Sequence, residues 1–315
     1  MRFDAMLPIG DFEQTALFAE RAESTGFDGV WTAEAAHDAF LPLMLAAEHT
    51  ERVVLGTGIA IAFARTPMTM AVAANDLHRY SHGRCILGLG SQIRPHIENR
   101  YSMPWSRPAA RMREFVLALR AIWASWNEGA RLDFRGEFYK HTLMTPMFNP
   151  GPNPHGPPRV YVAGVGGRMT HVAGEVADGL IVHPFTTVRY LQERILPAFE
   201  DGLAASGRMR SDVEVCFPGL VVLGDDRPMR NQLAFYGSTP AYHPVLELHG
   251  WLDLGLELNR LSKSDRPDKW QAMGELITDE VVQEFAITDA SDQRAAITQR
   301  FGGLVDRFTL PPASV

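Results

Sequence analysis

Short apolar runs alternate with amphipathic segments along most of this 315-residue chain. The runs are continuously apolar, which is typical of strands buried on both faces of a parallel sheet. Eight strands are predicted, at residues 2–7, 30–33, 52–62, 85–90, 160–163, 179–182, 213–223 and 304–310. Helices are predicted between most of them, at 12–25, 40–49, 67–81, 108–126, 187–206 and 291–302, with one more after the fifth strand.

This alternation predicts an α/β fold. Eight strand–helix units in a chain of roughly this length match a (β/α)8 TIM barrel. A doubly wound open sheet is the alternative that the same pattern permits. No linker or change of composition divides the sequence, so we expect a single domain over residues 1–315.

Three segments interrupt the regular pattern. Residues 91–107 follow the fourth strand, residues 127–158 are rich in Gly, Pro and Asn, and residues 224–278 follow the seventh strand. Loops this long are uncommon in compact domains and often form lids or binding elements. Because a TIM barrel binds its substrate at the carboxyl ends of its strands, we expect the two longer insertions, after strands four and seven, at that end.

A cluster of glycines follows the fifth predicted strand, in VYVAGVGGRMTHVAGEVADG (160–179). Backbone N–H groups at a helix N-terminus bind phosphate, and Gly164, Gly166 and Arg168 suit such a site. A dinucleotide-binding fingerprint is disfavoured, because Met169 stands where its third glycine belongs. A tight turn that needs glycine only for its backbone angles is the other interpretation.

A second glycine cluster ends the fourth predicted strand, in HGRCILGLGSQIR (82–94). Neighbouring parallel strands of a barrel end at the same mouth. The two clusters together therefore favour one shared phosphate site.

Composition excludes several classes of partner. The formal net charge of −7 argues against a nucleic-acid binder. No apolar run approaches the roughly 20 residues that span a bilayer, and the N-terminus does not resemble a signal peptide. Cys85 and Cys216 lie in apolar runs, as buried thiols of a reducing compartment do. His78 and His82 lack a third ligand, so no metal site is predicted. We expect a cytoplasmic protein that acts on a small molecule.

Four stretches together resemble a known family: GFDGVWTAE (26–34), residues 46–71, SHGRCILGLGSQ (81–92) and residues 160–185. They are similar to the bacterial luciferase-like oxidoreductases, and within them to the branch that uses the deazaflavin coenzyme F420. The resemblance covers essentially the whole chain. It implies a TIM barrel, an oxidoreductase and a homodimer.

The resemblance also implies where the cofactor binds. The ring would lie across the carboxyl end of the barrel, backed by a bulged and often cis peptide after strand three. The residues implied there are Thr57, Gly58 and Ile59. The phosphate would be held by the loops after strands four and five, at Gly90, Ser91 and Gln92 and at Val165, Gly166, Gly167 and Arg168.

Glu34 and His37 match the position at which relatives carry polar residues facing the ring. Relatives often have Glu-His-His there, whereas this chain has Glu-Ala-Ala-His. Both are predicted catalytic residues, because hydride transfer needs a group that gives or takes a proton and histidine titrates near neutrality. The predicted substrate pocket contains Trp105, His183, Tyr236 and Tyr242.

Three functions are consistent with this pattern. The leading prediction is an F420-dependent oxidoreductase that transfers a hydride between the deazaflavin ring and a small organic substrate. The first alternative is a luciferase-like monooxygenase that uses the flavin FMN. The second alternative is a non-catalytic protein that binds the cofactor.

Overall fold

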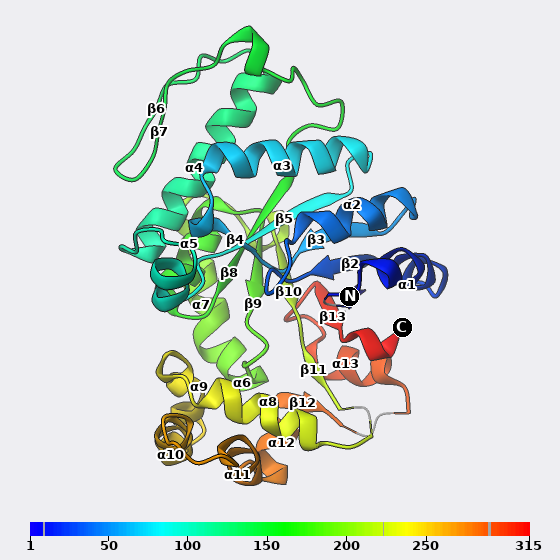
Figure 1. Cartoon of the computed structure of the whole chain (residues 1–315), viewed down its shortest axis with the longest axis vertical. Coiled ribbons are helices and arrows are strands. Elements are labelled where there is room, and N and C mark those ends of the chain that lie inside the picture. The colour runs from blue at the N-terminus through cyan, green and yellow to red at the C-terminus, as the bar shows by residue number, and fades with distance from the viewer. Residues whose placement is uncertain (9, 223, 289–290) are drawn as a thin grey trace.

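The computed structural model describes residues 1–315 except 9, 223, 289 and 290. Eight parallel strand positions close into a barrel, because β3 pairs with β2 on one side and with β5 on the other (Figure 1). The TIM barrel is confirmed and the open sheet is wrong. The barrel strands are β1 (Arg2–Met6), β2 (Gly29–Thr32), β3 (Val54–Thr57) continued by β4 (Ala60–Ile61), β5 (Cys85–Gly90), β8 (Arg159–Gly164), β9 (Gly179–Val182), β10 (Glu214–Phe217) and β13 (Arg307–Leu310).

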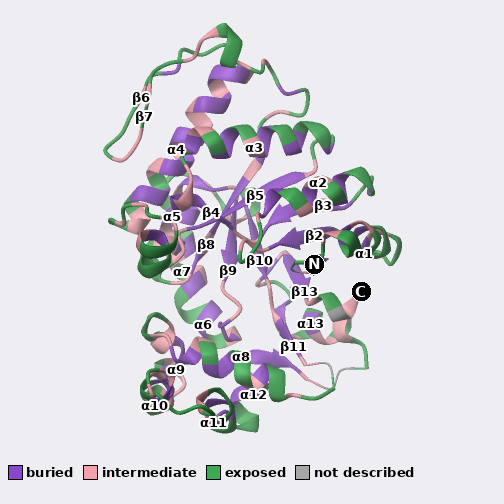
Figure 2. Cartoon of the chain, viewed as in Figure 1, coloured by how far each residue is buried: buried purple, intermediate pink, exposed green. Residues whose placement is uncertain are grey.

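A ring of helices surrounds the barrel, with buried inner faces and exposed outer faces (Figure 2). Local signals start several of them: Asp11 and Thr66 cap their helices through hydrogen bonds to backbone N–H groups, and Pro67 occupies a first helical turn. The ring consists of α1 (Phe12–Ser24), α2 (Phe40–Glu48), α3 (Pro67–Tyr80), α4 (Pro108–Asn127), α5 (Gly167–Val176), α6 (Val188–Tyr190) with α7 (Leu196–Ala205), and α13 (Gln293–Phe301).

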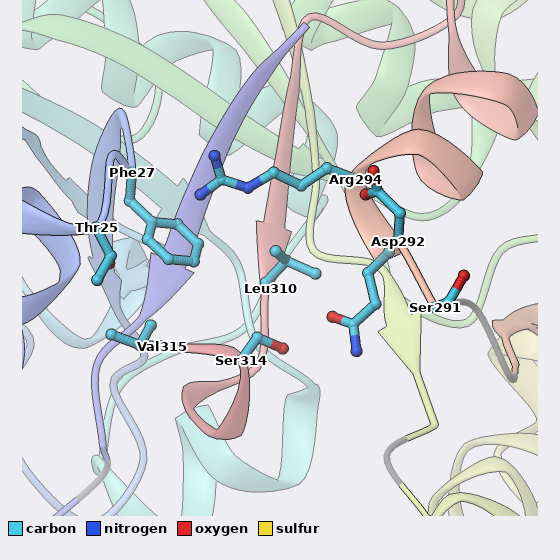
Figure 3. A pocket seen from close by; sticks show the side chains of 9 residues that line it. Thr25, Phe27, Ser291, Asp292, Arg294, Leu310, Ser314 and Val315 are labelled. Carbon is cyan, nitrogen blue, oxygen red and sulfur yellow. The ribbon is translucent and has the colours of Figure 1, made fainter.

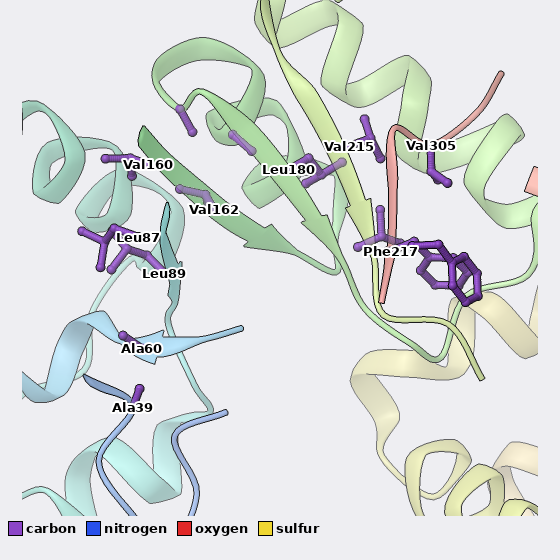
Figure 4. Close-up of a cluster of buried hydrophobic side chains, with 14 of the residues drawn as sticks. Ala39, Ala60, Leu87, Leu89, Val160, Val162, Leu180, Val215, Phe217 and Val305 are labelled. Carbon is purple, nitrogen blue, oxygen red and sulfur yellow. The ribbon is translucent and has the colours of Figure 1, made fainter. Parts of the chain in front are cut away.

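The main core lies between the strands and this ring. Side chains alternate along a strand, so every second residue faces the helices. Leu87 and Leu89 of β5, Val160 and Val162 of β8, and Leu180 of β9 are such residues, and all are fully buried in this cluster (Figure 4). The residues between them point into the barrel, where Trp31, Ile86, Tyr161, Ile181 and Cys216 form a second cluster.

The amino-terminal end of the barrel interior is polar. Arg307 and Asp4 form a bidentate ion pair with N–O distances of 2.8 and 2.6 Å, and the Trp31 indole N–H donates to Asp4. The Tyr161 hydroxyl donates to Glu214 in the same region. Gly56 makes room for this packing, because a Cβ there would overlap the Trp31 ring. The end opposite the predicted site is thus closed by charged pairs.

The prediction that residues 127–158 lie at the active end is wrong. The segment follows α4 and leads into β8, which places its two ends at the amino side of the barrel. There His155 packs between the rings of His78 and His82. Its antiparallel pair β6 (Phe134–Arg135) and β7 (Lys140–His141) turns back along α4, where Glu114 accepts N–H bonds from the turn.

The seventh predicted strand is shorter than expected. The run 213–223 splits into β10 and β11 (Leu220–Val221), because Pro218 lacks an N–H and Gly219 packs against the Phe308 ring. Leu223 lies outside the described residues. A group of short helices then extends from the carboxyl side of β9 and β10, in the lower part of Figure 1. It contains α8 (Arg227–Gly237), α9 (His243–Leu248), α10 (Leu252–Ser262), α11 (Lys269–Glu275) and α12 (Asp279–Phe285), followed by β12 (Ala286–Ile287).

None of the helices in the described part of the chain is both long and apolar enough to cross a bilayer.

Candidate active site

A one-residue bulge interrupts the third barrel strand at its carboxyl end. Gly56 pairs with Ile86, whereas Ala60 pairs with Leu89, so β3–β4 uses one more residue than β5 over this stretch. The peptide bond Gly58–Ile59 within the bulge is cis, at the position that the resemblance implies. The Ile59 side chain is partly exposed and packs on the inward-facing cluster of the barrel. The bulge therefore presents an apolar surface at the carboxyl mouth.

Thr57 fastens the bulge to the next strand. Its hydroxyl donates to the Gly88 carbonyl at 2.7 Å and accepts the Gly88 N–H at 2.8 Å, and the residue is fully buried. Both hydrogen-bonding capacities are thus used within the barrel. Thr57 therefore fixes the shape of the bulge, and its direct contact with a cofactor stays a prediction.

Glu34 holds the other side of the bulge. Its backbone N–H donates to the Ile59 carbonyl at 3.1 Å, and its carboxylate accepts the Ile61 N–H at 2.8 Å. The same carboxylate pairs with Arg65 at 2.6 Å, and Arg65 also pairs with Asp38. Burial opposes the charge of the Arg65 guanidinium, but the bonds to Glu34 and Asp38 outweigh it and raise its pKa. These contacts give Glu34 a positioning role, while proton transfer by Glu34 stays a prediction.

His37 lies in the loop after β2, at the same mouth. It is exposed, and its ring meets the Phe12 ring edge-to-face with centroids 5.4 Å apart. Gly10, at φ +90°, lies against it, and a Cβ there would come within 3.2 Å of His37 Nε2. His37 is thus exposed at the mouth, and proton transfer by His37 stays a prediction.

The two glycine clusters meet as predicted at one end of the barrel. β5 and β8 are hydrogen-bonded neighbours, with Leu89 opposite Val162, so their carboxyl ends lie side by side. Helix α5 begins at Gly167 directly after β8, and its first backbone N–H groups have no partner within the helix. Gly166 and Arg168 are exposed, and a Cβ on Gly166 would meet no atom within 4 Å. The chain thus offers an open, positively polarised helix end suited to phosphate.

Gly90 is the last residue of β5, and Ser91 and Gln92 begin the loop that follows it. A Cβ on Gly90 would lie 2.7 Å from the Ile59 side chain, so this glycine accommodates the bulge. Gln92 adopts φ +59°, a left-handed conformation that favours glycine. Ser91 and Gln92 are half-buried at the mouth. Their contact with a phosphate stays a prediction.

Three of the four predicted pocket residues come together at the end of β9. The His183 ring stacks on Tyr242 with centroids 4.4 Å apart and meets Tyr236 edge-on at 5.0 Å. Trp105 lies elsewhere, edge-on to Phe63 at 5.8 Å. It packs the loop after β5 onto the residues that follow the bulge.

Three residues with contacts around the predicted site were not among the predicted site residues. Arg111 is buried, lies over the Phe63 ring at 4.5 Å and donates to the Tyr139 hydroxyl at 2.8 Å. Phe185 stacks on Phe285 at 4.4 Å and joins β9 to the group of short helices. Arg65, which pairs with Glu34, is the third such residue. Each of these contacts joins segments that lie far apart in the sequence.

A hollow of about 480 Å³ lies on the outside of the barrel (Figure 3). It is lined by the turn after α1, the start of α13 and the C-terminus, including Phe27, Arg294 and Val315. None of the predicted site residues lines it. In the described part of the chain, no cluster of three or more His, Cys, Asp or Glu side chains is arranged to hold a metal ion.

Comparison with known proteins identifies the family. The family model described as luciferase-like monooxygenase matches residues 2–304. The chain belongs to this family. An uncharacterized protein of Mycobacterium tuberculosis is 54% identical over 98% of this chain and 92% of its own length. A putative coenzyme F420-dependent oxidoreductase of the same organism is 31% identical over 86% of this chain and 82% of its own.

Among solved structures, the coenzyme F420-dependent tetrahydromethanopterin reductase of Methanopyrus kandleri superposes with a TM-score of 0.79. It is 19% identical and covers 98% of this chain and 92% of its own, which shows the shared fold. As a luciferase-like protein with F420-dependent relatives, the chain is an oxidoreductase. The family predicted from the sequence is confirmed.

Proposed function

We propose that this luciferase-like oxidoreductase uses coenzyme F420 and transfers a hydride between the deazaflavin ring and a small organic substrate. One observation carries the proposal: the partly exposed Ile59 of the bulge and the open N-terminus of α5 lie at the same mouth of a closed barrel. An apolar platform and an anion site together suit a cofactor with a flat ring and a phosphate. The F420-dependent relative supports the same cofactor.

Each part of the mouth has a distinct task in this proposal. The backbone N–H groups at Gly166 and Gly167, with Arg168, hold the phosphate. Gly58 and Ile59 support the ring, and Glu34 keeps the bulge in place through its bonds to Ile59 and Ile61. Bound F420 would supply a ring carbon that exchanges a hydride with the substrate. The protein contributes alignment and water exclusion, which hydride transfer needs most.

His37 is our proposed proton donor or acceptor for the substrate. Replacing His37 with alanine is expected to lower turnover by roughly ten- to a thousandfold, as loss of general acid–base catalysis does. Cofactor affinity is expected to change less than threefold, because the exposed ring forms no described hydrogen bond within the barrel. Single-turnover kinetics and a cofactor titration separate the two quantities. Equal losses in turnover and affinity would contradict a proton-transfer role.

The second candidate is an FMN-dependent monooxygenase, and the description of the matching family model favours its monooxygenase activity. Titrating the purified protein with oxidised F420 and, separately, with FMN distinguishes the candidates through cofactor absorbance and fluorescence. We expect saturable F420 binding and FMN binding at least tenfold weaker. The reverse order would defeat our proposal in favour of the monooxygenase. The third expectation, a non-catalytic protein that binds the cofactor, has no support from the oxidoreductase family to which the chain belongs.

We also propose that the chain forms a homodimer. Leu143, Met147 and Phe148 of the segment 127–158 are 77%, 89% and 72% exposed. Large apolar side chains exposed together mark interaction surfaces. Light scattering is expected to give twice the 35.0 kDa mass of one chain. The mass of a single chain would contradict the dimer.

A further inference from the structure

Three rings from different elements meet at the carboxyl end of β9. His183 follows the last strand residue, Tyr236 lies on α8, and Tyr242 lies in the turn Pro240–Tyr242 before α9. The His183 ring is stacked on Tyr242 with an interplanar angle of 25° and meets Tyr236 at 80°. The long insertion after β10 therefore supplies two walls around an imidazole that belongs to the barrel.

The alternation of side chains along β9 points His183 toward the barrel axis. Gly179 adjoins the inward-facing Tyr161 ring, and Ile181 belongs to the inward-facing cluster. Because side chains alternate along a strand, position 183 continues the inward register. The same cluster includes Ile59 of the bulge. His183 therefore lies at the mouth on which the proposed cofactor ring rests.

A hydrogen bond fixes the chemical form of this histidine. The Phe185 backbone N–H donates to Nδ1 at 3.1 Å, so Nδ1 is an acceptor. Burial lowers the pKa of His183 to about 4, so the ring is neutral near pH 7. A neutral imidazole with an unprotonated Nδ1 carries its proton on Nε2. None of the described residues accepts a hydrogen bond from Nε2, and the ring is only partly covered.

The walls around this donor are aromatic and uncharged. Burial, together with the nearby Tyr236, raises the pKa of Tyr242 to about 12, so the phenol stays protonated. Phe185, which is 2% exposed, packs against both tyrosines and holds them in place. A neutral donor between aromatic faces suits an uncharged oxygen, since a buried anion would require a positive partner.

We propose that His183, Tyr236 and Tyr242 form a subsite for a flat, uncharged carbonyl compound whose oxygen accepts a hydrogen bond from His183 Nε2. The Tyr236 and Tyr242 rings stand at 89° to each other, so the face of one stacks on the plane of the ligand and the other meets the ligand edge-on. This inference specifies the substrate class of the proposed oxidoreductase, so it rests on the proposed function. His183 determines specificity here and transfers no proton.

Three small probes of similar shape test the subsite in the full-length protein. Acetophenone has the carbonyl, cumene has none, and benzoate carries a negative charge. Dissociation constants come from ligand-observed NMR titrations, with and without saturating oxidised F420. We expect acetophenone to bind at least about fivefold more tightly than either of the others, as one hydrogen bond supplies.

Matched variants locate the effect. His183→Phe keeps an aromatic ring but removes the donor, so it should abolish the preference for acetophenone over cumene and leave cumene binding within about twofold. Tyr242→Phe removes only a hydroxyl and should keep the preference. Nitrogen-15 NMR of the histidine ring should show the proton on Nε2 in the unmodified protein.

Several results would overturn the subsite: no acetophenone binding, tighter binding of benzoate, equal losses for acetophenone and cumene in His183→Phe, or a proton on Nδ1. The two proposals fail separately. In one outcome, F420 does not bind while His183→Phe still abolishes the preference for acetophenone that is measured without cofactor. That result would contradict the proposed cofactor and support the subsite. If F420 binds and the preference is absent, only the subsite falls.

Discussion

Replacing Arg307 with leucine is expected to lower the free energy of unfolding by roughly 3–5 kcal/mol, the usual cost of leaving a buried charge unpaired. Arg307 and Asp4 are 1% and 0% exposed, and Arg307 supplies two of the three hydrogen bonds that the Asp4 carboxylate receives. In the variant only the Trp31 N–H would remain. Urea unfolding followed by circular dichroism measures the loss.

Two further variants show whether the unpaired charge is the cause. Arg260→Leu removes an exposed pair with Glu257 and should cost less than about 1 kcal/mol. Asp4→Leu combined with Arg307→Leu removes both charges and should recover most of the loss. Similar losses for Arg260→Leu and Arg307→Leu, or a double variant that is weaker still, would show that the pair does not act as argued.

Replacing Gly166 with aspartate is expected to weaken F420 binding at least a hundredfold without destabilising the fold. A Cβ at this position meets no atom within 4 Å, and φ is −103°, so a side chain fits without strain. Gly166 is the N-cap of α5, where aspartate stabilises a helix. Two negative charges about 4 Å apart near a surface repel by roughly 4 kcal/mol. This energy corresponds to a more than hundredfold loss of cofactor affinity.

The matched controls separate charge from bulk. Gly166→Asn caps the helix equally well and fills the same space without the charge, so its affinity should lie between those of the other forms. Gly166→Ala should stay within a few-fold of the unmodified protein. Affinity is measured by F420 fluorescence and stability by thermal unfolding. If aspartate and asparagine have equal effects, the phosphate does not lie at this helix end.

Local patterns were enough to predict most of the barrel. The predicted strands 85–90 and 179–182 coincide with β5 and β9. Short, continuously apolar stretches between turn residues are typical of strands that are buried on both faces of a parallel sheet. The position of the cis bond followed from the resemblance to the family. The two glycine clusters end neighbouring strands, as expected.

Other features depend on contacts that local patterns do not encode. Asp4 and Arg307 are separated by 303 positions, and nothing in either neighbourhood predicts the pair. Arg65, which fixes Glu34, is likewise set by the closure of the barrel. The location of residues 127–158 was predictable after all: a segment that follows a helix and leads into a strand enters a TIM barrel from the amino side.

A crystal structure with bound F420 tests the central claim most directly. Our account predicts the phosphate within about 3 Å of the backbone N–H groups at the start of α5, as a hydrogen bond requires, and the ring against Gly58 and Ile59. A phosphate bound at another part of the chain, such as the hollow beside Arg294, would contradict it.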